Sequence, residues 1–175
     1  MRSTISKHRM FILTGLLATA MLCSSVASAQ VKAPSWAYTD DKVPNHAKAF
    51  YDINVTDAET MKNFLWVIDE TYNLLISKGV PACQIKFVVS LRGMSVTYAT
   101  ETFNDEAGNG DAIRGFLASL ISKGVRIEAC DISLDWMGVA AADLFEGIAV
   151  IDNAFAAAIF YQRRGFATVP ITSLP

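Results

Sequence analysis

The pentapeptide Ile-Ser-Lys-Gly-Val occurs twice in this chain, at residues 76–80 and again at residues 121–125. In each copy a lysine precedes a glycine, which is typical of the end of a helix, because glycine readily adopts the left-handed conformation found there. An apolar segment follows each copy, Gln84–Ser90 after the first and Val125–Ala129 after the second. The repeat therefore predicts two helices, each followed by a strand.

The same pattern extends in both directions from the repeat. A strand is expected over Ala49–Asn54, and the capping-box sequence Thr56-Asp57-Ala58-Glu59 predicts the start of a helix that runs to about Lys78. Towards the C-terminus, Ile148–Ile151 is a short apolar strand. A further helix is expected to end at Arg163-Arg164-Gly165, before a strand over Phe166–Ile171.

Strands and helices thus alternate along the chain, with one short helical turn after the third strand. This order predicts an α/β fold: a single domain over residues 48–172, with a mostly parallel five-stranded sheet and helices on both faces. The carboxyl ends of such strands meet at one edge of the sheet, and open α/β sheets bind their ligands there.

The first 29 residues have the features of a secretory signal peptide. Arg2, Lys7 and Arg9 precede the apolar run Met10–Cys23, and Ala27-Ser28-Ala29 supplies a cleavage motif, so cleavage is expected after Ala29. A lipoprotein signal at Cys23 is the alternative. The mature protein is expected to be periplasmic or secreted, with no membrane attachment, and residues 30–47 are expected to form an extended N-terminal arm.

Charge and motifs exclude several functions. The chain has 15 Lys and Arg and 17 Asp and Glu, and three of the basic residues leave with the signal peptide; the remaining 12 give a net charge of −5. An acidic domain does not favour nucleic acid as a partner. There is no Gly-x-Gly-x-x-Gly after the first strand, no Gly-x-Ser-x-Gly, and no His/Cys cluster with metal spacing. No cofactor or metal is expected.

Cys130 is the predicted reactive residue. It directly follows the strand Val125–Ala129 and precedes a short helical turn over Ser133–Gly138, with Ser133 expected as the cap. A helix N-terminus favours the thiolate, which is the nucleophilic form, whereas the neighbouring Asp131 disfavours a second negative charge. The alternative is that Cys130 is a buried packing residue.

Cys83 is expected at the opposite edge of the sheet, because it precedes the second strand. The rise of about five strand residues separates the two cysteines by ~17 Å, whereas a disulfide needs Cα atoms within ~7 Å. An intrachain disulfide is therefore not expected, and Cys83 is interpreted as a small, partly buried hydrophobic residue.

Other polar residues follow the strand ends. Ser90 and Arg92 close the second strand, where Arg92 could hold an anion or stabilise a thiolate, or simply be solvated. Asp152 and Asn153 follow the fourth strand and fit a helix cap better than a catalytic role. The candidate binding residues are Ser90, Arg92, Asp131, Ser133 and Asn153.

The sequence Ala-Cys-Asp-Ile-Ser-Leu-Asp-Trp-Met-Gly-Val at residues 129–139 resembles the cysteine motif of DsrE/DsrF-like proteins, which have the YchN-like fold. The Lys-Gly-Val before it and the Arg-Gly-Phe-Ala-Thr-Val after it also fit, so the resemblance covers about residues 48–171. It implies a five-stranded parallel domain that assembles into trimers or hexamers. In the sulfur-relay members the matching cysteine carries a persulfide and passes sulfane sulfur to a partner protein, a role that falls here on Cys130 alone.

Three functions remain open from the sequence. The first is a periplasmic sulfur-handling protein in which Cys130 carries sulfur, with a sulfur donor or acceptor protein as partner. The second is a non-catalytic, oligomeric binding or adaptor module with a structural cysteine. The third is a thiol redox sensor that forms a sulfenate or an intersubunit disulfide.

Overall fold

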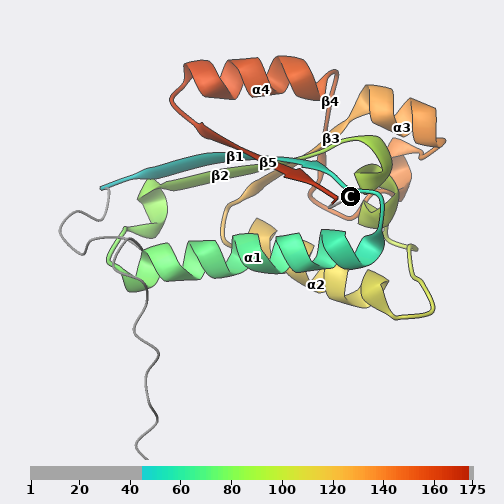
Figure 1. Ribbon diagram of the computed structural model, residues 1–175, viewed down its shortest axis with the longest axis horizontal. Helices are drawn as coiled ribbons and strands as arrows, with labels where there is room; N and C mark the ends of the chain where they lie inside the picture. Colours follow the sequence, from blue (N-terminus) through green and yellow to red (C-terminus); the bar gives the residue numbers. More distant parts are fainter. Residues whose placement is uncertain (1–44, 174–175) are drawn as a thin grey trace, which may run out of the picture. The chain divides into compact units, whose positions relative to one another are not determined.

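The computed structural model describes residues 45–173 and contains one five-stranded parallel sheet (Figure 1). The strand order is β4-β3-β2-β1-β5, and every neighbouring pair is parallel. The α/β fold class predicted from the sequence is confirmed. The predicted signal peptide and residues 30–44 of the predicted arm lie outside the described residues. The strands are β1 Ala47–Asn54, β2 Ile85–Leu91, β3 Arg126–Cys130, β4 Ala149–Ile151 and β5 Ala167–Thr172.

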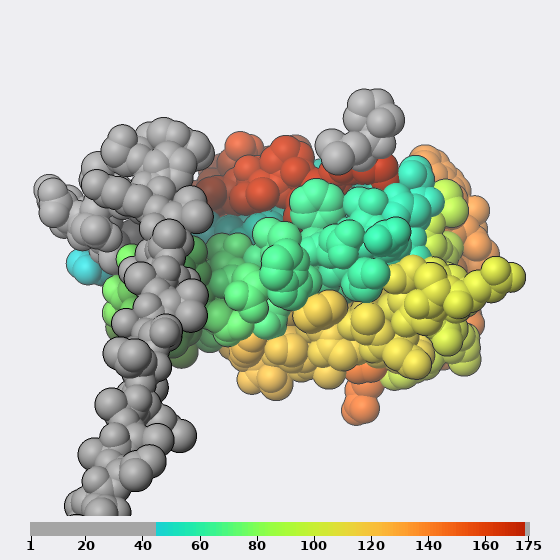
Figure 2. Space-filling model, turned by 60° about the horizontal axis from the view of Figure 1, so that its bottom comes forward, coloured from blue at the N-terminus to red at the C-terminus, as the bar shows by residue number. Residues whose placement is uncertain are grey.

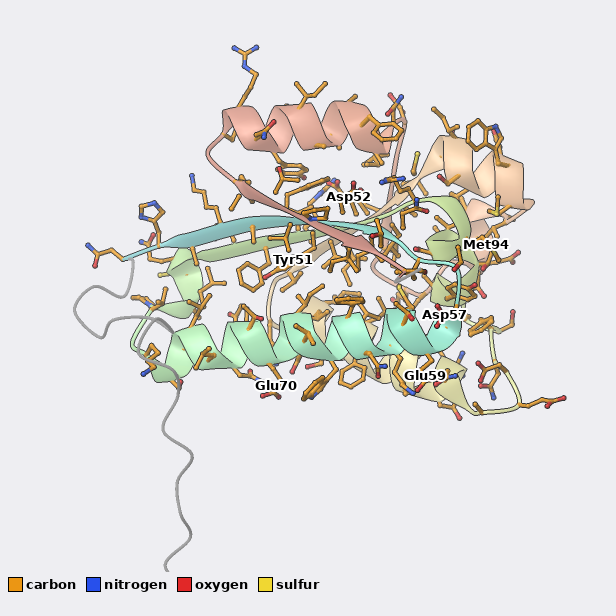
Figure 3. The ribbon with its side chains drawn as sticks, in the orientation of Figure 1. Tyr51, Asp52, Asp57, Glu59, Glu70 and Met94 are labelled. Atoms are coloured by element: carbon orange, nitrogen blue, oxygen red, sulfur yellow. The ribbon has the colours of Figure 1, made fainter. Side chains whose placement is uncertain are left out.

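Helices cover both faces of this sheet. α1 (Ala58–Ser77) and α2 (Asn109–Ser122) lie side by side on one face, which Figure 2 shows from outside. Side chains of β1 such as Tyr51 point towards this face and join the main hydrophobic core (Figure 3). α4 (Ala154–Arg163) lies on the other face, where the Tyr161 ring stacks on Phe50.

Two details at helix starts differ from the sequence predictions. Asp57, not Thr56, caps α1: its carboxylate accepts from the Thr60 amide at 2.7 Å, and Thr56 instead contacts Ser173. The short helix α3 spans Asp131–Met137 and begins two residues earlier than expected, so Cys130 is both the last residue of β3 and the N-cap residue of α3. Ser133 therefore lies within the helix and is not its cap.

The repeated Lys-Gly-Val has the same conformation in both copies. Gly79 and Gly124 have φ of +91° and +80°, and the following valine amides bond back to the carbonyls of Leu75 and Leu120, each at 3.0 Å. A side chain at either glycine would be strained in this backbone region. The repeat thus ends α1 and α2 in the same way and directs the chain into β2 and β3.

Lys123 of the second copy also joins the two helices. Its ammonium donates to Asp69 of α1 at 2.6 Å, and the Ser119 hydroxyl donates to the same carboxylate oxygen at 2.8 Å. Burial alone would raise the pKa of Asp69, but the hydrogen bonds from Lys123 and Ser119 and the lysine charge leave it below its ordinary value. The ion pair therefore stabilises the fold only while Asp69 is ionised.

No helix within residues 45–173 is long and apolar enough to span a membrane.

We predict that Asp69→Asn lowers the free energy of unfolding by about 2 kcal/mol at neutral pH, because the Lys123 ammonium loses its opposite charge and the hydrogen bonds from Lys123 and Ser119 then end on a neutral amide. Since the folded-state pKa is lowered, the wild-type advantage is present above the pKa of the unfolded carboxyl and disappears as the pH falls through the folded value. Urea unfolding of both proteins from neutral pH to about pH 3 measures this. Glu70→Gln, at an exposed position on α1, is the control; an equal loss in both variants would contradict the assignment.

Candidate functional site

Cys130 lies at the carboxyl edge of the sheet, between β2 and β4. It pairs in register with Ile151 of β4, and one residue earlier Ala129 pairs with Leu91 of β2. Its side chain is free and only 5 % exposed. The structure thus places the predicted reactive thiol where the fold was expected to bind ligands, beneath a nearly closed surface.

Cys83 lies at the other edge, in the short 3-10 helix η1 (Ala82–Gln84) that precedes β2. Its thiol is also free. The two cysteines lie at opposite edges of the sheet, as expected, but Cys83 is exposed rather than partly buried. It is therefore a natural internal control for the reactivity of Cys130.

A row of polar side chains crosses the sheet at the level of Glu128, two residues before Cys130 on β3. Asp52, Ser90 and Glu128 are register neighbours on β1, β2 and β3, so they point to the same face, the one covered by α4 (Figure 3 shows Asp52). Side chains alternate along a strand, so Cys130 shares this face with Glu128. Buried polar groups in such a row need partners, and most have them.

Glu128 is 2 % exposed, and one of its carboxylate oxygens is held from two sides. The Arg126 guanidinium forms an ion pair with Oε1, and the Tyr161 hydroxyl of α4 donates to the same atom at 2.6 Å. The second oxygen, Oε2, and the hydroxyl of Ser90 are buried without a hydrogen-bond partner among the described residues. Glu128 Oε2 and the Ser90 hydroxyl can therefore still form hydrogen bonds, on the sheet face that they share with Cys130.

Arg92 is already paired at the edge. Its guanidinium donates to both carboxylate oxygens of Asp52, at 2.7 and 3.1 Å, and lies 5.0 Å from the centre of the Phe155 ring. Because Asp52 lies on β1, this bidentate pair joins the end of β2 to the neighbouring strand β1. The predicted anion-binding role of Arg92 would have to use donors that Asp52 leaves unoccupied.

Ser133 and Asn153 both have structural partners. The Ser133 hydroxyl accepts from the Gly93 amide at 2.9 Å and so joins α3 to η2 (Gly93–Ala99). Gly93 has φ of +56°, and a Cβ there would clash with the Asn54 amide oxygen. Asn153 accepts from the amides of Phe155 and Ala156 and caps α4, as the helix-cap interpretation expects.

Asp131, the last predicted binding residue, is exposed in the first turn of α3.

The sequence reasoning missed three residues of the site: Asp52, Glu128 and Tyr161. The charged residues at alternate positions 126 and 128 inside an otherwise apolar strand were the available signal for Glu128. Tyr161 gave no signal, because its contact with Glu128 spans 33 residues.

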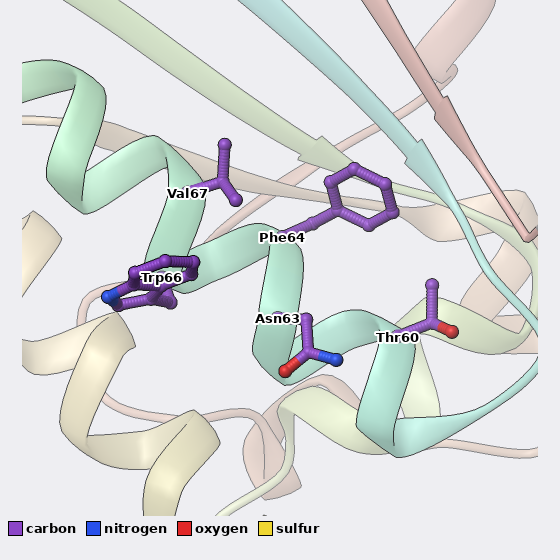
Figure 4. Close-up of a pocket in the computed structure, with 5 residues that line it drawn as sticks. All are labelled: Thr60, Asn63, Phe64, Trp66 and Val67. Carbon is purple, nitrogen blue, oxygen red and sulfur yellow. The ribbon is translucent and has the colours of Figure 1, made fainter. Parts of the chain in front are cut away.

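A hollow of ≈ 470 Å³ lies elsewhere, on the outer side of α1 (Figure 4). Its lining, Thr60, Asn63, Phe64, Trp66 and Val67, contains no titratable side chain. No group of three or more His, Cys, Asp or Glu side chains in the described part of the chain could hold a metal ion. The chemistry-bearing residues gather at the edge around Cys130 instead.

Comparison with solved structures identifies the fold. The YchN protein from E. coli matches with a TM-score of 0.54 at 15 % identity, over 73 % of this chain and 99 % of that chain. The fold is YchN-like. MTH1491 from Methanobacterium thermoautotrophicum, described as a protein of unknown function, matches with a TM-score of 0.54 at 22 % identity, over 71 % of this chain and 98 % of its own. No protein-family model and no curated protein matches the sequence.

The YchN-like fold expected from the residue 129–139 motif is thus confirmed, and identities this low establish the fold alone. In this YchN-like sheet, Cys130 lies at the carboxyl end of β3, the strand end where the sequence predicts it. The polar row of Asp52, Ser90 and Glu128 crosses the same face of the sheet and meets β3 at Glu128, two residues before Cys130.

Tyr161 offers a direct test of the polar row. Burial and the hydrogen bond to Glu128 raise its pKa to about 12. We predict that the difference in phenolate absorbance between wild type and Tyr161→Phe titrates at about pH 12. Because the folded-state pKa is raised, the stability that Tyr161 contributes is present below about pH 10 and is lost as the pH rises towards 12. A difference that titrates near pH 10 would show that the Glu128 contact is absent.

Proposed function

We propose that this protein handles sulfane sulfur, and that Cys130 carries the sulfur as a persulfide. One observation carries the proposal: a free thiol closes β3 of a YchN-like sheet, within a motif that resembles the cysteine motif of DsrE/DsrF-like proteins. The protein would act as a sulfur carrier with a donor or acceptor protein as its partner. It needs no cofactor for this chemistry.

The transfer step balances without an external oxidant. The Cys130 thiolate attacks the outer sulfur of a donor persulfide, a new S–S bond forms on Cys130, and the donor S–S bond breaks. The donor leaves as a thiolate and takes up the proton that Cys130 released. With 5 % exposure, Cys130 favours a small terminal sulfur atom over a bulky electrophile.

The polar row supports this role. Arg126 and Tyr161 hold one carboxylate oxygen of Glu128. Its Oε2 and the Ser90 hydroxyl, on the face shared with Cys130, are buried without a hydrogen-bond partner among residues 45–173. Arg92, held by Asp52, fixes the neighbouring strand end. These groups would position the thiol and the sulfur that it accepts, whereas an ordinary packing cysteine would need only apolar neighbours.

Residues 1–29 support export of the protein, so we place this sulfur handling in the periplasm or outside the cell. We also propose that the protein is a homo-oligomer, a trimer or hexamer. α4 is apolar on most of its surface, yet only Ala154 is buried; Phe155, Ile159 and Phe160 are 64, 63 and 48 % exposed. A helix that is apolar all round is normally covered.

The sulfur-carrier role predicts that polysulfide treatment adds one sulfur atom to Cys130, as seen by intact-mass and peptide mass spectrometry. Cys130→Ser should lose this adduct, whereas Cys83→Ser should keep it, because Cys83 lies at the opposite edge. If wild type gains no sulfur on Cys130, the adaptor alternative is favoured. If peroxide instead produces a Cys130-linked dimer on non-reducing gels, the redox-sensor alternative is favoured.

The oligomer predicts a separate result. Phe155→Asp combined with Ile159→Asp should weaken self-association by at least about tenfold. The double variant lacks two large apolar side chains whose burial would stabilise the interface. Sedimentation velocity measures the change. Val67→Asp, exposed on α1, is the matched control and should leave the oligomer intact. A monomeric wild-type protein would exclude this proposal.

A further inference from the structure

We infer that the outer face of α3 docks an arginine-bearing segment of the protein that exchanges sulfur with Cys130. The inference rests on the proposed function and names the chemistry of the partner. α3 begins at the residue after Cys130, so whatever docks on this helix is placed beside the thiol.

The outer face of α3 combines an aromatic ring with two carboxylates. Trp136 is 77 % exposed and Ile132, one turn earlier, is 39 % exposed. Asp131 and Asp135 are also exposed, have the same four-residue spacing, and form no ion pair within residues 45–173. The inner residues Ser133 and Leu134 are buried, which fixes the helix with this face outward.

Neighbouring segments extend the apolar part of this surface. η2 packs against α3, with Gly93 hydrogen-bonded to Ser133. The next residue, Met94, is 42 % exposed and lies at the α3 end of the sheet in Figure 3. Met137, at the end of α3, is 37 % exposed. Exposed aromatic and methionine side chains around a reactive centre are typical of a protein-binding surface.

Charge selects the partner. Between Asp131 and Gln162 the chain has five acidic residues and no lysine or arginine. Arg92, which follows β2 directly before η2, is already paired with Asp52. The surface therefore favours a cationic protein segment over free anionic sulfur compounds, which reach Cys130 more slowly.

Arginine fits this surface better than lysine. A guanidinium stacks flat on an indole ring and, at the same time, donates two hydrogen bonds to a carboxylate in the plane of the group. Trp136 supplies the ring and Asp131 or Asp135 the carboxylate. A lysine ammonium would gain the charge but neither the stacking nor the paired hydrogen bonds.

The test separates docking from chemistry. Cys130→Ser protein, which cannot accept sulfur, is titrated with three short synthetic peptides in which one cysteine is flanked by arginine, glycine or glutamate. The indole N–H signal of Trp136, assigned by its loss in Trp136→Phe, reports binding by NMR. At low salt, the arginine peptide should bind about tenfold more tightly than the glutamate peptide. This ratio of affinities should decrease above about 0.3 M salt, because salt screens the charges.

The same peptides, prepared as persulfides, then serve as sulfur donors to wild-type protein. Sulfur transfer to Cys130 should follow the binding order. Trp136→Ala and the pair Asp131→Asn with Asp135→Asn should remove the preference for the arginine peptide. Trp66→Ala, a half-exposed tryptophan on α1, and Glu59→Gln should keep it.

The outcomes are distinct. Equal binding of the arginine and glutamate peptides, or a preference that survives the α3 variants, would overturn the docking inference whether or not Cys130 carries sulfur. If the arginine peptide binds but no persulfide peptide transfers sulfur, the docking inference is supported and the sulfur-carrier function is rejected. If Trp136→Ala dissociates the oligomer in sedimentation velocity, a second copy of the chain covers α3, and the inference is overturned.

Discussion

Burial of the Glu128 carboxylate is the constraint on which one whole face of this molecule depends. A carboxylate that is 2 % exposed in the middle of a sheet is costly unless it is paired and hydrogen-bonded. Arg126 meets this need from the same strand, and Tyr161 meets it from α4. The same tyrosine stacks on Phe50 and contacts Phe166, so the helix that satisfies the charge is also held over β1 and β5.

This arrangement gives the two faces of the sheet different characters. The face under α1 and α2 is an apolar core, joined at its rim by the Asp69–Lys123 ion pair. The face under α4 contains the polar row of Asp52, Ser90 and Glu128, and the helix above it leaves large apolar side chains exposed. One sheet thus has an apolar face and a partly polar face, and Cys130 lies on the second.

Much of the architecture could be predicted because its causes are local. The Lys-Gly-Val repeat ends two helices through backbone conformation alone, and apolar runs of the right length define strands to within one or two residues. The start of α1 was less predictable, since Thr56 and Asp57 are both good caps, and the choice depended on Ser173, which contacts Thr56 across 117 positions. The site was predictable in outline only: Cys130 follows from strand order, but Glu128 and Tyr161 meet through tertiary contact.

By itself, the sequence determined the parallel α/β order of elements, the separation of Cys83 from Cys130, and the place of Cys130 at a strand end, because each depends on spacing along the chain. Only the tertiary structure decided that Arg92 is paired with Asp52, that Ser133 joins two segments rather than capping a helix, and that a buried carboxylate lies below the thiol. These outcomes depend on register between strands and on a helix that returns across the sheet. Hydrogen bonds and ion pairs act over a few ångströms, and only the folded chain brings such distant residues that close.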